Sequence, residues 1–189
     1  MVMYSPGKTS SYPDEPVDKG LRYHFLGGGS EVGNVGIVLE GVKGDRLLID
    51  YGLAPTDPPR YPAEAPKVSD VIVTHSHIDH IGMIPWISGS HHSTLHATHV
   101  TVALSELMWR DCHKVSRIEG YPLPWDKRDI DFALESWKVH NFGEWVKHGN
   151  WKWRLHPAGH IPGAAMVEID TGNKKVLLSG DFDTRDSSL

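Results

Sequence analysis

The segment Thr74–His80 constrains the fold of this chain more than any other, because four of its seven residues can bind a metal ion. The apolar run of residues 70–73 before it indicates a buried strand. Residues 81–87 after it indicate a short helix that tolerates a proline in its first turn. The candidate ligands therefore lie on a strand-to-helix turn, and we expect the rest of the chain to be organised around it.

Three histidines and one aspartate make up this cluster. His75 and His77 project from the same side of an extended segment, whereas Asp79 and His80 begin the helix. A lone histidine is usually a surface or core side chain. Imidazoles and a carboxylate grouped this closely are instead the ligands that zinc-class metals prefer. The spacing therefore predicts a metal site.

Length and composition fit a soluble globular chain. Its 189 residues suit about one domain, with 39% hydrophobic and 23% charged residues. No apolar run is long enough to cross a membrane, and the N-terminus lacks the charged and then apolar pattern of a signal peptide. No membrane partner is therefore expected. Cys112 is the only cysteine, which rules out an internal disulfide and fits a reducing compartment. We expect a cytoplasmic protein.

Charge and aromatic content say little about nucleic acid. The formal net charge is −5, which does not indicate a protein that holds nucleic acid by net charge alone. Bound metal ions would add local positive charge that this count omits. Trp145, Trp151 and Trp153 could stack bases, but no basic patch surrounds them in the sequence, so packing within a sheet is the favoured interpretation.

Pattern and turn residues divide the chain into a flexible arm, residues 1–20, and one domain portion, residues 21–189. Alternation and short apolar runs predict further strands at 22–26, 35–40, 46–50, 94–98, 138–141, 144–148, 151–156, 164–170 and 174–179. Helices are predicted over residues 99–118 and after the cap residue Asp126. The glycines of 27–33 favour a tight turn, with a backbone wall beside a ligand as the alternative.

The two longer helices have predicted core faces. The first is expected to bury the stripe formed by Val100, Leu104, Leu107, Met108, Cys112 and Val115. The second is expected to carry Ile130, Ala133, Leu134 and Trp137. Both stripes are interpreted as core packing rather than as ligand sites.

Further polar residues follow other predicted strands. Asp50 ends one strand, and His160 and Asp181 lie at strand ends about a hundred residues beyond the histidine cluster. Strand ends present their loops at one edge of a sheet, so a metal site assembled from these residues is physically reasonable.

Taken together, these motifs resemble the metallo-β-lactamase superfamily, whose His-x-His-x-Asp-His signature is intact here. Residues 157–165 (PAGHIPGAA) and 179–185 (SGDFDTR) resemble its β-CASP nuclease branch. That branch includes RNase J and the cleavage-and-polyadenylation-factor endonucleases. The resemblance covers residues 21–189. It implies an α/β (α+β) fold, the αββα sandwich of that superfamily.

The resemblance also implies a two-zinc site, with roles carried over by matching position. His75, His77 and His160 would hold one zinc ion, Asp79 and His80 would begin the shell of the other, and Asp181 would bridge both. Asp50 would orient a histidine or the bound water. Asp79 would take the proton of the attacking water.

One departure from the family pattern matters. The β-CASP insert should begin just after Asp181, and later strands should bring one histidine for the second zinc and another that assists the leaving group. This sequence stops at Leu189. We therefore expect an N-terminal portion of an incomplete fold: a truncated form, a gene fragment, or a chain completed by a second polypeptide or by self-association. His156 is a spare candidate for the missing ligand.

Three functions follow as hypotheses. The favoured one is a zinc-dependent ribonuclease acting on single-stranded RNA, in RNA processing, including mRNA 3′-end processing, or decay. The second is a small-substrate hydrolase, such as a thioesterase, lactonase or lactamase. Those usually carry a Pro-Gly-His or Thr-x-Gly-His loop, whereas Ala158 precedes Gly159 here. The third is a non-catalytic subunit that a partner completes.

Overall fold

A computed structural model describes residues 16–185, so most of the predicted arm lies outside the described residues. The first sheet contains β1 (Leu21–Gly27), β2 (Gly36–Gly41), β3 (Arg46–Tyr51), β4 (Asp70–Ile72), β5 (Thr94–Ala97) and β6 (Trp137–Val139), in that order. The second contains β10 (Lys175–Leu178), β9 (Ala165–Asp170), β8 (Trp151–Pro157) and β7 (Val146–His148). The helices are α1 (Ile78–Ile81), α2 (Ile84–His91), α3 (His99–Glu119) and α4 (Lys127–Glu135).

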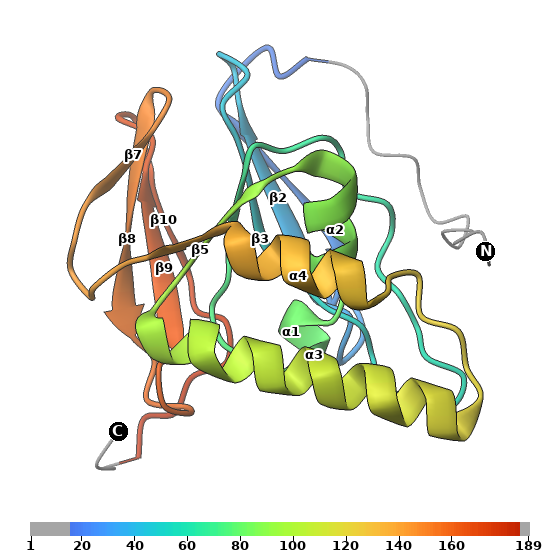
Figure 1. The fold of residues 1–189 in the computed structure, drawn as a ribbon. Helices are drawn as coiled ribbons and strands as arrows, with labels where there is room; N and C mark the ends of the chain where they lie inside the picture. Colours follow the sequence, from blue (N-terminus) through green and yellow to red (C-terminus); the bar gives the residue numbers. More distant parts are fainter. Residues whose placement is uncertain (1–15, 186–189) are drawn as a thin grey trace.

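These elements form three layers, with the helices on one face of the first sheet and the second sheet against its other face (Figure 1). The mixed α/β fold predicted from the sequence is confirmed. Among residues 16–185, no helix covers the outer face of the second sheet. No helix in this range is long and apolar enough to cross a membrane.

Strand direction places the predicted site at one edge. β3, β4 and β5 pair in parallel, so their carboxyl ends meet at the same edge of the first sheet. Asp50 lies at the end of β3, and Thr74 lies just beyond β4. Crevices outside the carboxyl ends of parallel strands are the usual binding sites of such sheets.

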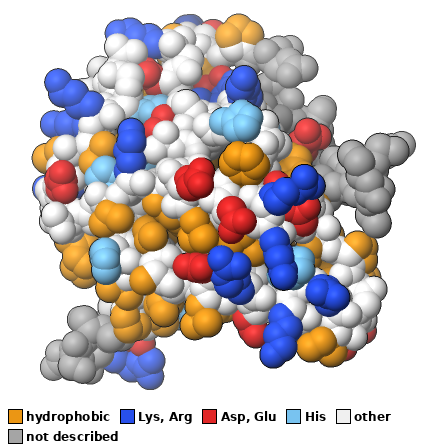
Figure 2. Space-filling view, in the orientation of Figure 1, with side chains coloured by type: hydrophobic (Ala, Val, Ile, Leu, Met, Phe, Trp, Pro, Cys, Tyr) orange, Lys and Arg blue, Asp and Glu red, His pale blue; other side chains and the backbone are white. Residues whose placement is uncertain are grey.

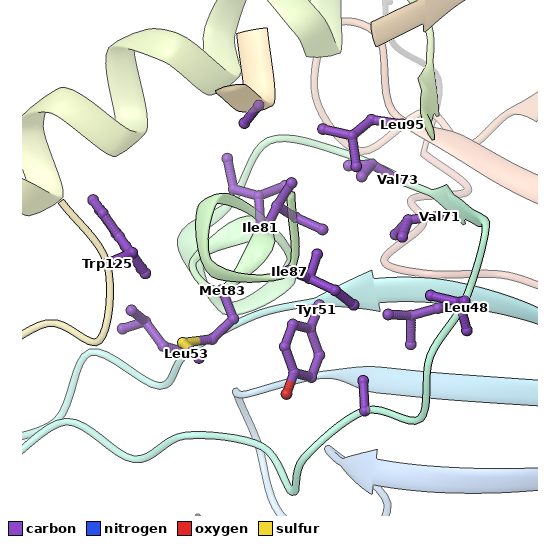
Figure 3. Packing of buried hydrophobic residues seen from close by; sticks show 14 of the residues in the cluster. Leu48, Tyr51, Leu53, Val71, Val73, Ile81, Met83, Ile87, Leu95 and Trp125 are labelled. Atoms are coloured by element: carbon purple, nitrogen blue, oxygen red, sulfur yellow. The ribbon is translucent and has the colours of Figure 1, made fainter. Parts of the chain in front are cut away.

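The central strands β2, β3 and β4 of the first sheet are buried on both faces, which explains their continuous apolar sequences. Leu47 and Ile49 of β3 pack against Trp153 and Val167 of the second sheet. Leu48, between them, belongs to the core under the helices. In that core, side chains of the first sheet and of the loops around it gather about α1 and α2 (Figure 3).

The short helix predicted over residues 81–87 is instead two helices. The helix is interrupted at Gly82, where a Cβ would lie 2.5 Å from both the Ile78 carbonyl oxygen and the side chain of Leu53. The next amide, of Met83, donates to the Tyr51 carbonyl at 2.8 Å. This bond to β3 replaces an intrahelical one, and α2 then restarts with proline in its first turn, as predicted.

The predicted core face of α3 is only partly correct. Val100, Leu107 and Val115 are exposed, and the fully buried positions are Thr101, Ser105, Trp109 and Ser116. Buried hydroxyls are tolerated because they have acceptors: Ser105 Oγ, for example, donates to the Thr101 carbonyl at 2.7 Å. The helix is therefore rotated from the orientation that its apolar residues predict.

Two tryptophans differ from the prediction. Trp137 lies in β6 rather than in α4, and stacks on Trp109 at 6.0 Å between ring centroids. Trp145 precedes β7, and the cations of Lys152 and Arg154 lie 4.6 and 4.5 Å from its ring centroid. Trp151 and Trp153 are buried between the sheets, which confirms the packing interpretation for these two.

Candidate metal centre

The extended segment after β4 is held in place by a buried carboxylate. Asp50 accepts two hydrogen bonds from Thr74, one from the amide at 2.8 Å and one from the hydroxyl at 2.7 Å. The Ala165 amide, from the second sheet, donates to the Thr74 carbonyl at 2.8 Å, so Thr74 is hydrogen-bonded to both sheets. Asp50 has a φ of 56°, a left-handed conformation that aspartate tolerates better than most side chains.

The turn of α1 packs against glycine-containing backbone. A Cβ on Gly52 would lie 1.7 Å from the Asp79 carbonyl oxygen, so only glycine allows this approach. The Val35 amide donates to the same oxygen at 2.8 Å. Gly28 and Gly33 have positive φ, which supports the tight-turn interpretation of residues 27–33. Val35, just after that turn, therefore holds the backbone of Asp79 by a hydrogen bond.

Two loops bring the distant candidate ligands to this edge. Gly159 has a φ of 69°, and next to it the Asp183 amide donates to the Ala158 carbonyl at 3.0 Å. This bond joins the loop that carries His160 to the loop that carries Asp181. The hydroxyl of Thr98, the N-cap of α3, donates to the Gly163 carbonyl at 2.7 Å and fixes the far side of the first loop.

Four of the predicted ligands form one compact group. His77 Nδ1 lies 3.1 Å from His75 Nε2 and 3.3 Å from His160 Nε2. Asp181 Oδ2 lies 3.9 Å from His75 Nε2 and 3.6 Å from His160 Nε2. Tetrahedral zinc with bonds of about 2.0–2.1 Å to nitrogen separates its ligand atoms by about 3.3 Å. One atom from each of these four residues lies within 4.8 Å of the others, so the donor set fits a metal ion.

A second, looser group shares Asp181. Its other oxygen, Oδ1, lies 3.5 Å from His80 Nε2, and His80 Nε2 lies 4.0 Å from Asp79 Oδ2. The two oxygens of Asp181 therefore face different histidine groups. Its side chain is 47% exposed, so the space between the groups is open to solvent.

Hydrogen bonds assign which ring nitrogens are free. The Nδ1–H of His80 donates to Asp50 Oδ2 at 2.7 Å, because a carboxylate only accepts. The Thr74 hydroxyl donates to Asp50, so it accepts from the Nδ1–H of His75 at 3.0 Å. Both rings therefore turn Nε2, the nitrogen not used in these bonds, toward Asp181. Such outer partners fix tautomer and orientation in metal sites.

The histidine pKa values follow from burial and neighbouring charge. Burial, with the positive charge of His80 as a smaller cause, lowers the pKa of His75 to about 3. Burial and His160 also lower the pKa of His77. Burial would likewise lower the pKa of His80, but the charge and hydrogen bond of Asp50 outweigh it and raise that pKa. Neutral His75 and His77 offer lone pairs to a metal near neutral pH.

Two residues differ from expectation. His156 is not brought to this edge, because its Nε2 lies 2.7 Å from Glu168 on the second sheet. Thr74, which received no role from the sequence, connects Asp50 to His75. Its position as a hydroxyl residue directly before the first histidine was the only signal for that role.

The fold and the ligand group define a two-sheet α/β protein with a candidate metal centre at the carboxyl edge of its parallel strands. The model of the metallo-β-lactamase superfamily matches residues 28–188. The chain therefore belongs to that superfamily.

Curated relatives refine this assignment. The chain is 31% identical over 170 residues to RNase aCSPSF2 of Saccharolobus solfataricus, a match that covers 87% of this chain and 34% of that protein. It is 33% identical over 178 residues to cleavage and polyadenylation specificity factor 73 of Drosophila melanogaster, with 90% of this chain and 26% of that protein covered. The predicted resemblance is confirmed, and the chain spans about a third or less of either relative.

A solved structure agrees with the fold. An archaeal metallo-β-lactamase superfamily protein from Sulfolobus tokodaii aligns with a TM-score of 0.51 and 18% identity, over 80% of this chain and 60% of that one. At this identity the likeness concerns the fold alone.

Proposed function

We propose that this chain is the metal-binding portion of a zinc-dependent ribonuclease that hydrolyses single-stranded RNA. The observation that carries the proposal is Asp181, whose two oxygens face the His75 group on one side and His80 on the other. A carboxylate placed in this way suits a bridge between two metal ions. The relatives' names, an RNase and a cleavage and polyadenylation specificity factor, support RNA as the substrate and RNA processing as the role.

Each ligand has a proposed part. His75, His77 and His160 would hold one zinc ion, with Asp181 shared, and Asp79 and His80 would contact the other. Zinc ions bound there would lower the pKa of a water and polarise the scissile phosphate. Asp79 would accept a proton; its carboxylate is 27% exposed and lies 4.0 Å from His80 Nε2, which supports this role. Asp50 keeps His80 oriented.

We further propose that the second group is completed from outside the described residues. Those residues offer it Asp79, His80 and the shared Asp181. The relatives are about three to four times longer than the matched segment, so residues of the same polypeptide or of a partner could add a ligand. Tyr23 and Phe25 are exposed on β1, which is an edge strand among residues 16–185, and they support such a partner because exposed apolar side chains favour association.

Cleavage of a 5′-labelled single-stranded RNA by zinc-loaded full-length protein, or by this chain reconstituted with the part that completes it, tests the proposal. His77→Ala should abolish cleavage, and His99→Ala, which removes an exposed histidine, should not. Intact RNA after incubation with this completed, zinc-loaded protein would contradict the ribonuclease, as would full activity of His77→Ala. Turnover of a thioester or lactam in its place would favour the small-substrate hydrolase.

A further inference from the structure

A basic groove lies between the C-terminal half of α3 and the start of α4, away from the metal ligands. It has a volume of about 550 Å³ and is lined by Arg110, His113, Lys114, Arg117 and Lys127, with Ile130 buried beneath. Lys and Arg side chains gather over this end of α3 on the face shown in Figure 2. This concentration is unexpected in a chain whose formal charge is −5.

The groove is poorly neutralised. Arg110 pairs with Glu106 at 2.8 Å, and Asp131 lies 3.8 Å from it. Among residues 16–185, by contrast, no carboxylate oxygen lies within 4.0 Å of the charged nitrogens of Lys114, Arg117 or Lys127. Three cations therefore face this groove without an acidic partner in the described part of the chain.

Helix stability does not account for this arrangement. The macrodipole favours cations in the last turn of a helix, which suits Arg117. Lys127 begins α4, where the same effect is unfavourable. Arg110 and Lys114 are like charges four residues apart, and they repel on a helix surface. An anion bound between the two helices would remove these costs.

α3 also connects the groove to the candidate metal centre. Thr101 in its first turn donates to the Gly163 carbonyl of the loop that carries His160. Trp109 donates to the Ile81 carbonyl at 2.9 Å, directly after the ligand turn. At 1.5 Å rise per residue, the groove lies about 14–24 Å along the helix from Thr101. Sites that take roughly 4–16 nucleotides of single strand span such a distance.

We infer that this groove binds the phosphate backbone of single-stranded RNA whose scissile phosphate lies at the metal centre. The inference rests on the proposed ribonuclease function. The lining cations would contact phosphates, and no Trp, Tyr or Phe is among the described residues that line the groove, so phosphate contacts rather than base stacking are expected to dominate. Binding is therefore expected to be independent of sequence and sensitive to salt.

The test is RNA binding by metal-free protein. Fluorescence anisotropy would follow a labelled, unstructured RNA of about 12 nucleotides between about 50 and 200 mM salt. Lys114→Glu combined with Lys127→Glu should weaken binding about tenfold or more and reduce the salt slope by about 1.4, at about 0.7 for each lost phosphate contact. Lys43→Glu with Lys174→Glu is the matched control, because both lysines are exposed and line one pocket whose residues do not include those of the groove. Thermal melting checks that both variants are folded.

The outcomes separate this inference from the proposed function. Equal RNA affinity of the groove variant and the control would overturn the inference that the groove binds RNA, whether or not RNA is cleaved. Groove-dependent binding without cleavage by the completed, zinc-loaded protein supports the groove and contradicts the ribonuclease. Binding of poly-glutamate, but not of RNA, through the same lysines would also overturn the inference, because it would indicate an acidic protein partner.

Discussion

Asp50 Oδ2 lies 2.7 Å from His80 Nδ1, and the same carboxylate accepts two hydrogen bonds from Thr74. One buried side chain therefore orients ligands of both histidine groups, His80 directly and His75 through the threonine hydroxyl. In such sites the residues behind the ligands decide how well the ligands are presented.

The first prediction concerns this carboxylate. Asp50→Asn keeps the shape but removes the charge and one acceptor, so His80 and Thr74 cannot both be satisfied. We expect zinc affinity to fall by about 10–100-fold, measured by competition with a chromophoric chelator. Asp111→Asn, on the exposed surface of α3, should leave affinity unchanged. Parental affinity in Asp50→Asn would show that the carboxylate has no part in presenting ligands.

The second prediction concerns the glycine behind Asp79. In Gly52→Ala the new Cβ would meet the Asp79 carbonyl at 1.7 Å, so the α1 turn must move. We expect a loss of about 1–3 kcal/mol in the free energy of unfolding together with weaker zinc binding. Urea unfolding and the chelator assay measure the two effects. Gly20→Ala strains a backbone with a φ of 76° but puts no atom within 4 Å of the new Cβ, so it should leave zinc binding intact whatever its effect on stability.

The third prediction concerns pH and Asp70, at the opposite end of β4 from the metal ligands. Burial would raise the pKa of Asp70, but hydrogen bonds from His148, His96 and Ser69 outweigh it and hold the pKa well below its usual range. A carboxylate with a depressed folded pKa stabilises the protein above its unfolded pKa of about 3.9, and the contribution fades as pH falls below that value.

Asp70→Asn removes this titration, so its stability should fall less steeply than that of the parent as the pH drops from about 5 toward 2. Urea midpoints across this range measure the slope. The exposed Asp18→Asn provides the comparison. Equal slopes for Asp70→Asn and the parent would show that the hydrogen bonds of Asp70 do not stabilise the folded state.

The order of residues along the chain was sufficient to predict the ligand turn. Strand, ligands and helix are contiguous between residues 70 and 91, so the local pattern already places His75, His77 and His80 together. His160 and Asp181 were candidates because they end strands and match a family pattern. That they approach within 4 Å of the first histidines depends on two sheets packing face to face.

The tertiary structure alone decided three features: the rotation of α3, the role of Thr74 and the basic groove. An apolar pattern predicts burial only of apolar side chains. Thr101 is buried with its hydroxyl bonded to the distant Gly163 carbonyl, and Ser105 is buried with its hydroxyl bonded to the Thr101 carbonyl one turn earlier in α3. The groove combines α3 with Lys127 of α4, and this pairing is invisible in either helix alone. Local periodicity thus determined the elements, and long-range hydrogen bonds and packing decided which faces meet.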